Sequence, residues 1–268
     1  GLYGALVIDN VAAGPSIGGM RMAPDVTVEE CFRLARAMTL KNAAAGLSHG
    51  GGKSVLVGDP HMPASEKEKF VRAFACALAN ERGYIFGPDM GTDEQCMSWV
   101  HDEIGRAVGL PRDIGGIPLD ELGATGFGLM HAVEAALPFA GLALDGARVA
   151  VQGFGSVGIH AARFLTGNGA VLVAASDSQG TIANDDGLDV EALTEHKHET
   201  GTVATFGSGK AGDPDAVVAV PCDIWIPAAR PDVVTVENVD RLQTRIVAQG
   251  ANIPLTDAAE LRLHEKGV

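Results

Sequence analysis

The chain is poor in aromatic residues, in basic residues and in cysteine, and it has no long apolar segment. Phe, Trp and Tyr make up 5% of the 268 residues, and 20 Lys and Arg stand against 34 Asp and Glu, which gives a formal net charge of −14. An acidic surface repels phosphate backbones, so we expect no nucleic-acid partner. The apolar runs are much shorter than the ~20 residues of a bilayer-spanning helix, so we expect no membrane partner.

The cysteines and histidines are few and scattered. Cys31, Cys76, Cys96 and Cys222 form no closely spaced pair, and the eight histidines show no metal-ligand spacing. No secretory signal opens the chain. These absences predict free thiols, no bound metal and a reducing, cytoplasmic environment.

The chain nevertheless has enough apolar residues for a large core, at 46% hydrophobic. Its length predicts two domains, and residues 109–123, rich in Gly, Pro and Asp, are the expected hinge. We expect the boundary between residues 122 and 123. The chain begins at Gly1 rather than Met and ends without a stop signal, so we interpret it as an internal segment of a longer protein.

In the first part, short strands are expected at residues 6–8, 55–57 and 84–86, with glycine-rich loops at residues 14–19 and 50–52. Helices are expected to begin at two capping boxes, Thr27 with Glu30 and Ser65 with Glu68, and a third helix is expected over residues 94–108.

From residue 148 onward, strand and helix patterns alternate. Strands are predicted at residues 148–152, 171–176, 216–220, 224–226 and 246–248, and helices at residues 125–137 and 156–166. Such alternation is typical of an α/β fold with a parallel, doubly wound sheet.

The segment after the strand at 148–152 fits the dinucleotide fingerprint G-x-G-x-x-G. Gly153 would permit the tight turn, Gly155 would let the backbone approach a pyrophosphate, and Gly158 would let helix and strand pack closely. Asp177, at the end of the next strand, would bind the adenosine ribose, and no cation follows it to hold a 2′-phosphate. We therefore expect NAD rather than NADP. The alternative is a glycine turn that only packs a helix on a sheet. The backbone of the turn adds Phe154, Ser156 and Val157 to the expected cofactor site.

Residues 38–60 place two lysines twelve positions apart, Lys41 at a helix end and Lys53 after three glycines. A second cation and partial burial lower the pKa of a lysine, which can then act as a base or activate water. A P-loop is excluded because Leu47 stands where that motif needs glycine and a strand follows. A surface lysine pair beside a turn is the simpler alternative.

These segments resemble the glutamate/leucine/phenylalanine/valine dehydrogenase superfamily. The run from Lys41 through Lys53 to Pro60 is similar to that family's catalytic segment. Residues 14–21 resemble its substrate-pocket loop, residues 88–92 its catalytic-aspartate loop, and residues 124–126 the start of its inter-domain helix. Residues 228–229 and 250–252 resemble its cofactor-domain loops. Compared with the family, the chain lacks the start of the substrate domain and the end of the NAD-binding Rossmann domain.

The resemblance implies a role for each matching residue. Lys41 would bind the substrate α-carboxylate, Lys53 would activate water and polarise the carbonyl, and Asp89 would move protons to and from the amino group. On the cofactor side, Thr125 would bind the nicotinamide carboxamide. The remaining implied positions are Ile17, Gly18, Gly19 and Gly87 around the substrate, and Ala228 and Asn252 beside the cofactor.

The expected reaction is the NAD-dependent oxidative deamination of an L-amino acid to a 2-oxo acid and ammonia, by a homo-oligomer. Glutamate-specific relatives carry a lysine where this chain has Ile17, so we expect an apolar substrate such as leucine, valine or phenylalanine, with glutamate as the alternative. Two other functional classes fit the sequence less well. A non-catalytic dinucleotide-binding paralogue conflicts with Lys41, Lys53 and Asp89, and a hydroxy-acid dehydrogenase would need a catalytic histidine beside an acid.

Overall fold

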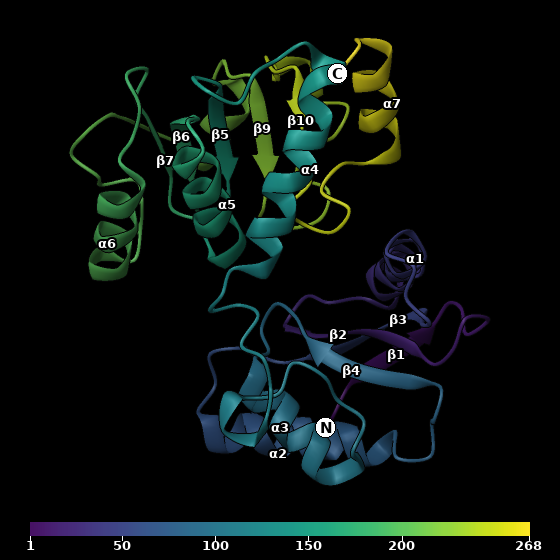
Figure 1. The fold of residues 1–268 in the computed structure, drawn as a ribbon. Helices are drawn as coiled ribbons and strands as arrows, with labels where there is room; N and C mark the ends of the chain where they lie inside the picture. Colours follow the sequence, from purple (N-terminus) through teal and green to yellow (C-terminus); the bar gives the residue numbers. More distant parts are fainter. The chain divides into compact units, whose positions relative to one another are not determined.

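A computed structural model describes all residues, 1–268, as two compact units, Gly1–Pro118 and Leu119–Val268 (Figure 1). They are called the first and second unit below, and each is described by itself. Both combine a β-sheet with helices, which confirms the expected α/β class.

The first unit contains a four-stranded sheet in the order β1-β3-β2-β4. Strand β1 pairs antiparallel with β3, and the other neighbours are parallel. The two glycine-rich segments expected as loops are strands instead. Strands β2 and β3 approach so closely that a Cβ on Gly18 would lie 1.7 Å from the carbonyl oxygen of Gly52. Here glycine marks close contact between strands rather than a turn. The strands are β1 (Gly4–Ile8), β2 (Ser16–Ala23), β3 (Gly50–Val57) and β4 (Tyr84–Pro88).

Helices cover both faces of this sheet. Helix α1 (Val28–Ala44) packs Cys31 with Val26 and Val55 on one face. Helices α2 (Ala64–Ala77) and α3 (Glu94–Ile104) pack on the other face, against a core that includes Met20 and Leu56.

The two predicted capping boxes have different outcomes. The Thr27 hydroxyl accepts a hydrogen bond from the Glu30 amide at 3.1 Å, so α1 begins as predicted. The second prediction is wrong, because α2 begins after Pro63 with no side-chain cap and Ser65 lies inside the helix. Proline already fixes φ close to its helical value there.

The second unit contains a six-stranded sheet in the order β10-β9-β5-β6-β7-β8. The four strands from β10 to β6 are parallel, which confirms the doubly wound pattern, and β7 and β8 add an antiparallel edge that the sequence did not indicate. The strand predicted at 216–220 is a 3₁₀ helix, Pro214–Ala219. The strands are β5 (Arg148–Gln152), β6 (Val171–Ser176), β7 (Thr181–Ala183), β8 (Lys210–Gly212), β9 (Ile224–Pro227) and β10 (Ile246–Val247).

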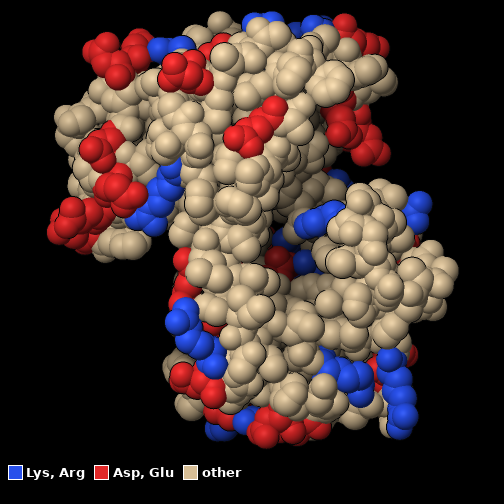
Figure 2. Space-filling view, in the orientation of Figure 1, with Lys and Arg blue, Asp and Glu red and all other residues tan.

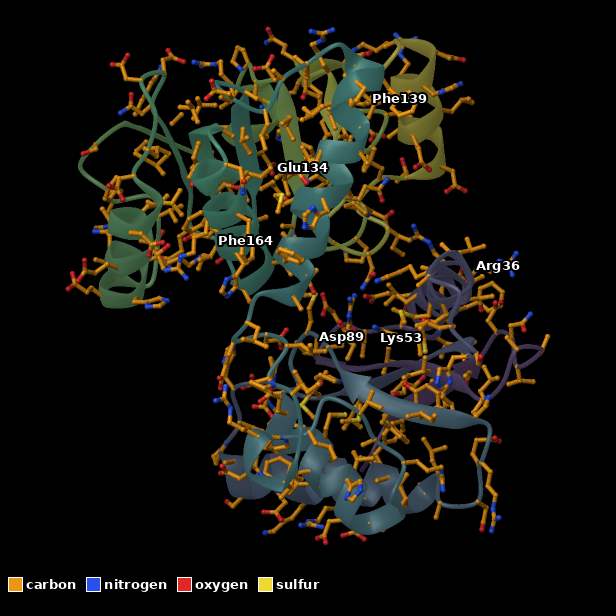
Figure 3. All side chains as sticks on the ribbon, viewed as in Figure 1. Arg36, Lys53, Asp89, Glu134, Phe139 and Phe164 are labelled. Carbon is orange, nitrogen blue, oxygen red and sulfur yellow. The ribbon has the colours of Figure 1, made fainter.

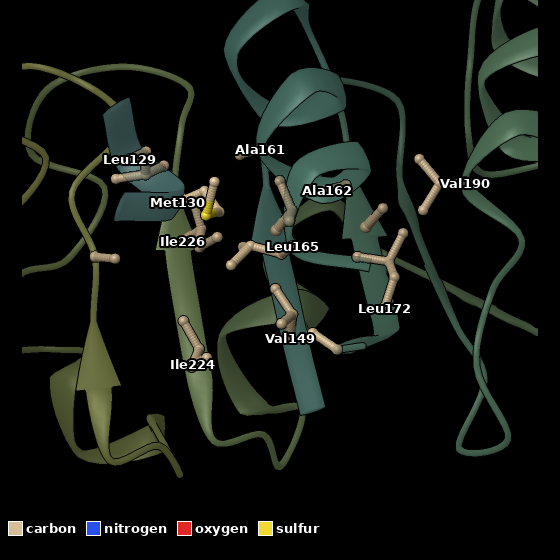
Figure 4. Packing of buried hydrophobic residues seen from close by; sticks show 14 of the residues in the cluster. Leu129, Met130, Val149, Ala161, Ala162, Leu165, Leu172, Val190, Ile224 and Ile226 are labelled. Carbon is tan, nitrogen blue, oxygen red and sulfur yellow. The ribbon is translucent and has the colours of Figure 1, made fainter. Parts of the chain in front are cut away.

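The sheet of the second unit separates two hydrophobic cores. On one face, α4 (Ala124–Ala140), α5 (Ser156–Gly167) and α6 (Val190–Thr200) pack onto the strands, with Leu165 against Val149 and Leu172 (Figure 4). On the other face, Trp225 packs with the 3₁₀ helix and with α7 (Asp257–Glu265). Two further 3₁₀ turns occur, at Arg112–Ile114 and Val239–Arg241.

The composition predicts neither a large basic surface nor a helix that spans a membrane. On the face drawn in Figure 2, acidic and basic side chains are scattered, and no broad patch of Lys and Arg is visible. No helix combines the length and the apolar character that crossing a bilayer requires.

Candidate active site

A buried ion pair joins Lys53 of β3 to Asp89, which directly follows β4. The Lys53 Nζ atom lies 2.5 Å from Asp89 Oδ2, and the side chains are 2% and 13% exposed (Figure 3). A charged lysine is rarely so deeply buried unless it is paired. The structure thus brings together the two residues that the sequence predicts as catalytic.

The loop after β4 holds Asp89 rigidly against β2. The Asp89 amide donates to Thr92 Oγ1 at 3.0 Å, and that hydroxyl donates to the Met20 carbonyl at 2.6 Å. The Met22 amide donates to the Met90 carbonyl. The backbone of the loop is therefore hydrogen-bonded to the neighbouring strand β2. These bonds fix the position of the Asp89 backbone, from which the carboxylate side chain extends.

The electrostatic environment keeps the Asp89 carboxylate ionised. Burial alone would raise the pKa of Asp89, but the Lys53 ammonium and the Arg21 guanidinium outweigh it and hold this pKa below its usual value. An ionised carboxylate beside an ammonium can accept a proton, as the proposed shuttle role requires.

The two glycines beside this pair differ in the space around them. A Cβ on Gly19 would lie 2.7 Å from Asp89 Cβ and 3.2 Å from Lys53 Nζ, so any larger residue would crowd both. At Gly87, by contrast, a Cβ would meet Val108 Cγ2 and the Gly18 backbone only at ordinary contact distances of 3.5–3.9 Å. Gly19 therefore lets the ion pair pack closely against β2, whereas Gly87 has room for a side chain.

Lys41 lies in the last turn of α1, in electrostatic contact with the pair. Lys41 is solvent-exposed, yet desolvation by the surrounding protein and the neighbouring Lys53 ammonium lower its pKa, while Asp89 opposes that shift. The helix end is tied to β3, because the Asn42 amide group donates to the Gly50 carbonyl at 2.7 Å. Two cations and one carboxylate thus converge, a pattern suited to an amino acid's carboxylate and amino group.

Ile17 lies on the same strand face as Gly19, because alternate residues of a strand share a face. Its Cα partners are Gly51 on β3 and Ile85 on β4. The sequence placed Ile17 in a pocket loop, but it lies on β2, and a second isoleucine is its neighbour. This end of the face is apolar.

Arg21 and Glu30 are functional candidates that the sequence argument missed. Arg21 is 3% exposed, and its Nε donates to Asp89 Oδ2 at 3.1 Å. Its Nη1 forms an ion pair with Glu30 Oε1. The available signal was strand alternation, which places residues 17, 19 and 21 on one face once residues 16–23 are recognised as a strand.

In the second unit, the three fingerprint glycines have the geometries that a dinucleotide site requires. Gly153 has a φ of +92°, which favours glycine. A Cβ on Gly158 would lie 2.0 Å from the Gly153 carbonyl oxygen, whereas one on Gly155 would meet nothing within 4 Å. The turn is therefore tight at Gly153 and closely packed at Gly158, and it is open at Gly155. Gly155 directly precedes α5, and the N-terminus of a helix favours a bound anion.

Of the other predicted cofactor residues, Thr125 lies at the start of a helix, and Ala228 and Asn252 lie in loops. Thr125, in the first turn of α4, lines a crevice with Ser156 and Val157 of α5. The Ala228 amide donates to the Gln152 carbonyl at 2.7 Å. Asn252 follows two amides, those of Gly250 and Ala251, that donate to the Pro227 carbonyl. These features fit a bound dinucleotide at the carboxyl ends of the parallel strands.

Asp177 ends β6 as predicted, but its carboxylate is occupied by protein donors. Oδ2 accepts from the Val203 amide at 2.7 Å and lies 3.3 Å from Lys197 Nζ. Oδ1 accepts from the Gln179 and Gly180 amides and from the Thr202 hydroxyl. Burial would raise the pKa of Asp177, but these partners hold it below its usual value.

A cavity of about 400 Å³ opens beside the fingerprint turn. It lies between α5 and α6, and Lys197 borders it together with the first turn of α5. The lining residues are Phe154, Gly155, Ser156, Ile159, His160, Arg163, Thr194, Lys197 and His198.

Comparison with known proteins identifies the family. Residues 115–268 match the Glutamate/Leucine/Phenylalanine/Valine dehydrogenase family, and residues 2–106 match its Glu/Leu/Phe/Val dehydrogenase, dimerisation domain. This chain belongs to the glutamate/leucine/phenylalanine/valine dehydrogenase family. The resemblance inferred from the lysine segment and the fingerprint is thereby confirmed.

Among curated relatives of the family, the chain is 41% identical to a glutamate dehydrogenase of Aeropyrum pernix over 97% of its length. It is 37% identical, over 99% of its length, to an NADP(+)-dependent glutamate dehydrogenase of Pyrobaculum calidifontis. The chain spans 65% and 67% of the lengths of these two proteins.

Solved structures similar to this chain are also glutamate dehydrogenases. A hetero-hexameric glutamate dehydrogenase from Thermus thermophilus, in a Leu-bound form, matches the whole chain at 31% identity with a TM-score of 0.91, over 66% of its own length. Glutamate dehydrogenase of Plasmodium falciparum matches with a TM-score of 0.86 over 62% of its length; at 24% identity this likeness supports the fold alone.

Proposed function

We propose that the protein catalyses the dinucleotide-dependent oxidative deamination of L-glutamate to 2-oxoglutarate and ammonia. The observation that carries the proposal is the convergence of Lys41, Lys53 and Asp89 on a glycine-lined face. Relatives that share 37–41% of its residues are named glutamate dehydrogenases, which favours glutamate over the apolar substrates expected from Ile17.

The roles of the three residues follow from their charges. Lys41 pairs with the α-carboxylate and Asp89 accepts a proton from the amino group, so that the substrate amine is neutral. The dinucleotide, when bound, supplies the hydride acceptor for the hydrogen on Cα. Lys53 then activates the water that attacks the resulting iminium carbon, and Asp89 returns its proton to the departing ammonia.

A second candidate is an apolar amino acid, and the neighbouring pair Ile17 and Ile85 favours it. A γ-carboxylate placed against two isoleucines would be an unpaired buried charge, which is costly. For glutamate to be the substrate, a cation from elsewhere must reach its γ-carboxylate.

Steady-state kinetics with glutamate, leucine, valine and phenylalanine separate the two candidates. The proposal expects the highest kcat/KM with glutamate and a further gain with glutamate in Ile17→Lys. Ile17→Leu is the matched control and should leave the order of substrates unchanged. A higher kcat/KM with leucine, valine or phenylalanine than with glutamate would favour the apolar candidate.

For the cofactor, we propose that the protein accepts both NAD and NADP, which widens the expected preference for NAD over NADP. Two oxygens of a carboxylate offer about four acceptor positions, and Asp177 already meets four protein hydrogen-bond donors and one ammonium. Its capacity to hold ribose hydroxyls and exclude a 2′-phosphate is therefore reduced. Lys197 is a cation beside it.

The ratio of kcat/KM for NAD to that for NADP tests this. We expect the two values to lie within roughly tenfold of each other. Lys197→Met should lower kcat/KM for NADP more than for NAD, because a lysine contact to the charged 2′-phosphate is stronger than one to a neutral ribose hydroxyl. Strict use of NAD with an unchanged ratio in Lys197→Met would support the original expectation.

We also propose that the protein works as a homo-oligomer. The support is that residues 2–106 match a region described as a dimerisation domain. A solution mass equal to one chain would count against it.

A further inference from the structure

Arg21 of β2 lies between two carboxylates in the interior of the first unit. Its Nε donates to Asp89 Oδ2 at 3.1 Å, and its Nη1 pairs with Glu30 on α1. The arginine side chain is 4% exposed, against 13% for Asp89 and 24% for Glu30. Arg21 and Lys53 are the only Lys, Arg, Asp or Glu residues that are buried.

Both cations contact the same oxygen of Asp89. Lys53 Nζ lies 2.5 Å from Oδ2, and Arg21 Nε lies 3.1 Å from the same atom. These two contacts on Oδ2 restrict rotation of the planar carboxylate about its Cβ–Cγ bond.

We propose that Arg21 is a positioning residue of the reaction, which orients the Asp89 carboxylate through its contact with Oδ2 and keeps it ionised so that it can receive the substrate's proton. This rests on the proposed function, because it assigns Arg21 to the proton transfers of that reaction.

An arginine suits position 21 because the neighbouring Lys53 changes its protonation state during the proposed reaction. Lys53 must be neutral before it can take a proton from the attacking water, and in that neutral form it does not compensate the charge of Asp89. A guanidinium does not lose its proton in proteins, and its planar group of donors can hold two carboxylates at once. Arg21 therefore remains a cation throughout the reaction cycle.

Glu30 anchors Arg21 from the other side. Its amide donates to Thr27 in the cap of α1, but its side chain turns to Arg21 instead of closing the capping box. Its negative charge offsets part of the positive charge that Asp89 experiences. Removing the charge of Glu30 should thus act on Asp89 in the opposite direction to removing that of Arg21.

The test follows the titration of Asp89 in the full-length protein in two ways. One is the pH profile of kcat/KM for glutamate. The other is the infrared band of the ¹³C-labelled Asp89 carboxylate, identified by its loss in Asp89→Asn. Arg21→Met is made together with Glu30→Met, because replacing both partners of a buried pair disturbs folding less than removing one. Arg36→Met, an exposed arginine of α1 that pairs with Asp9, is the control.

We expect the double variant to raise the pKa of Asp89 by less than the roughly 1–3 units that a neighbouring arginine alone contributes, because the loss of Glu30 offsets part of the shift, and to move the acid limb of the profile equally. Glu30→Gln should move both in the opposite direction. Arg21→Lys should lower kcat with little change in KM, because Arg21 does not touch the substrate. Arg36→Met should change neither.

An unchanged Asp89 titration in the folded double variant would overturn the proposal, and so would shifts of the same sign in the double variant and in Glu30→Gln. A wild-type protein that oxidises no amino acid would refute the proposed function instead. The infrared titration would still show whether Arg21 controls the ionisation of Asp89.

Discussion

At the scale of single residues, the account depends on Lys53. Its ammonium is buried, paired with Asp89 and placed beside a glycine-lined face. Lys53→Ala should lower kcat by about 10²–10⁴-fold, the usual contribution of a positioned acid or base. Binding of NADH, followed by fluorescence, should survive, because the fingerprint residues belong to the second unit. Lys69→Ala, an exposed lysine on α2, is the control. A Lys53→Ala variant that keeps more than a tenth of the rate would remove Lys53 from the mechanism.

Lys41 gives a pH-dependent prediction. Desolvation and Lys53 lower its pKa below the ordinary 10.5, so its ammonium loses its charge at a lower pH than a free lysine. The affinity for a 2-oxo acid, which has no amino group to titrate, should therefore fall as pH rises toward 10.5. Calorimetric Kd values across this range test it. Lys41→Arg should keep its affinity to higher pH, and an affinity that does not depend on pH in the wild type would contradict the assignment.

At this scale the sequence led to Lys53 and Asp89 but not to the residues that support them. Their proposed roles came from the resemblance of their segments to those of the dehydrogenase family. Arg21 ends the segment 14–21 that resembles the substrate-pocket loop, but it received no role, because its function depends on strand alternation in a segment expected to be a loop. The protein donors around Asp177 come from residues 197–203, which no local pattern connects to the end of β6.

At the scale of elements, the fingerprint turn offers a matched pair of glycines. Gly155→Ala should leave stability nearly unchanged, because its Cβ would meet nothing within 4 Å, yet it should weaken dinucleotide binding by occupying the space a pyrophosphate needs. Gly158→Ala should lower the Tm, because its Cβ would lie 2.0 Å from the Gly153 carbonyl oxygen. Gly167→Ala, also with open space, is the control. Equal effects of Gly155→Ala and Gly167→Ala on the Kd for NADH would contradict the cofactor site.

The elements were predicted best where apolar periodicity is strong, as in α1, β5, α5 and β6. They were missed where tertiary contact determines the structure. Residues 16–23 and 50–57 are strands because their glycines let neighbouring backbones approach, which local rules interpret as turns. Residues 216–220 have a strand-like composition, but Val217 and Val218 pack beside Trp225 from a 3₁₀ helix.

At the scale of the whole molecule, the buried charges should govern stability in acid. The pKa of Asp89 is lowered on folding, so its stabilising effect is complete above its unfolded pKa of about 3.9 and is lost as pH falls through the lower, folded value. At neutral pH, Asp89→Asn leaves the buried Lys53 ammonium without its partner and Arg21 with Glu30 alone, and it should cost about 3–5 kcal/mol.

Urea unfolding of wild type and Asp89→Asn from pH 7 down to pH 2 measures this. The difference in the free energy of unfolding should shrink as Asp89 becomes protonated. Asp102→Asn, at an exposed ion pair, should show a difference under about 1 kcal/mol at every pH. A difference for Asp89→Asn that stays constant to pH 2 would show that the carboxylate's charge is not the cause.

The most direct test of the central claim is hydride transfer itself. The full-length protein is incubated with L-glutamate deuterated at Cα and with NAD or NADP, and the reduced dinucleotide is analysed by mass spectrometry. The account predicts that each reduced nicotinamide carries one deuterium and that 2-oxoglutarate and ammonia form in equal amounts. Reduced dinucleotide without deuterium, or no reduction with either dinucleotide, would contradict it.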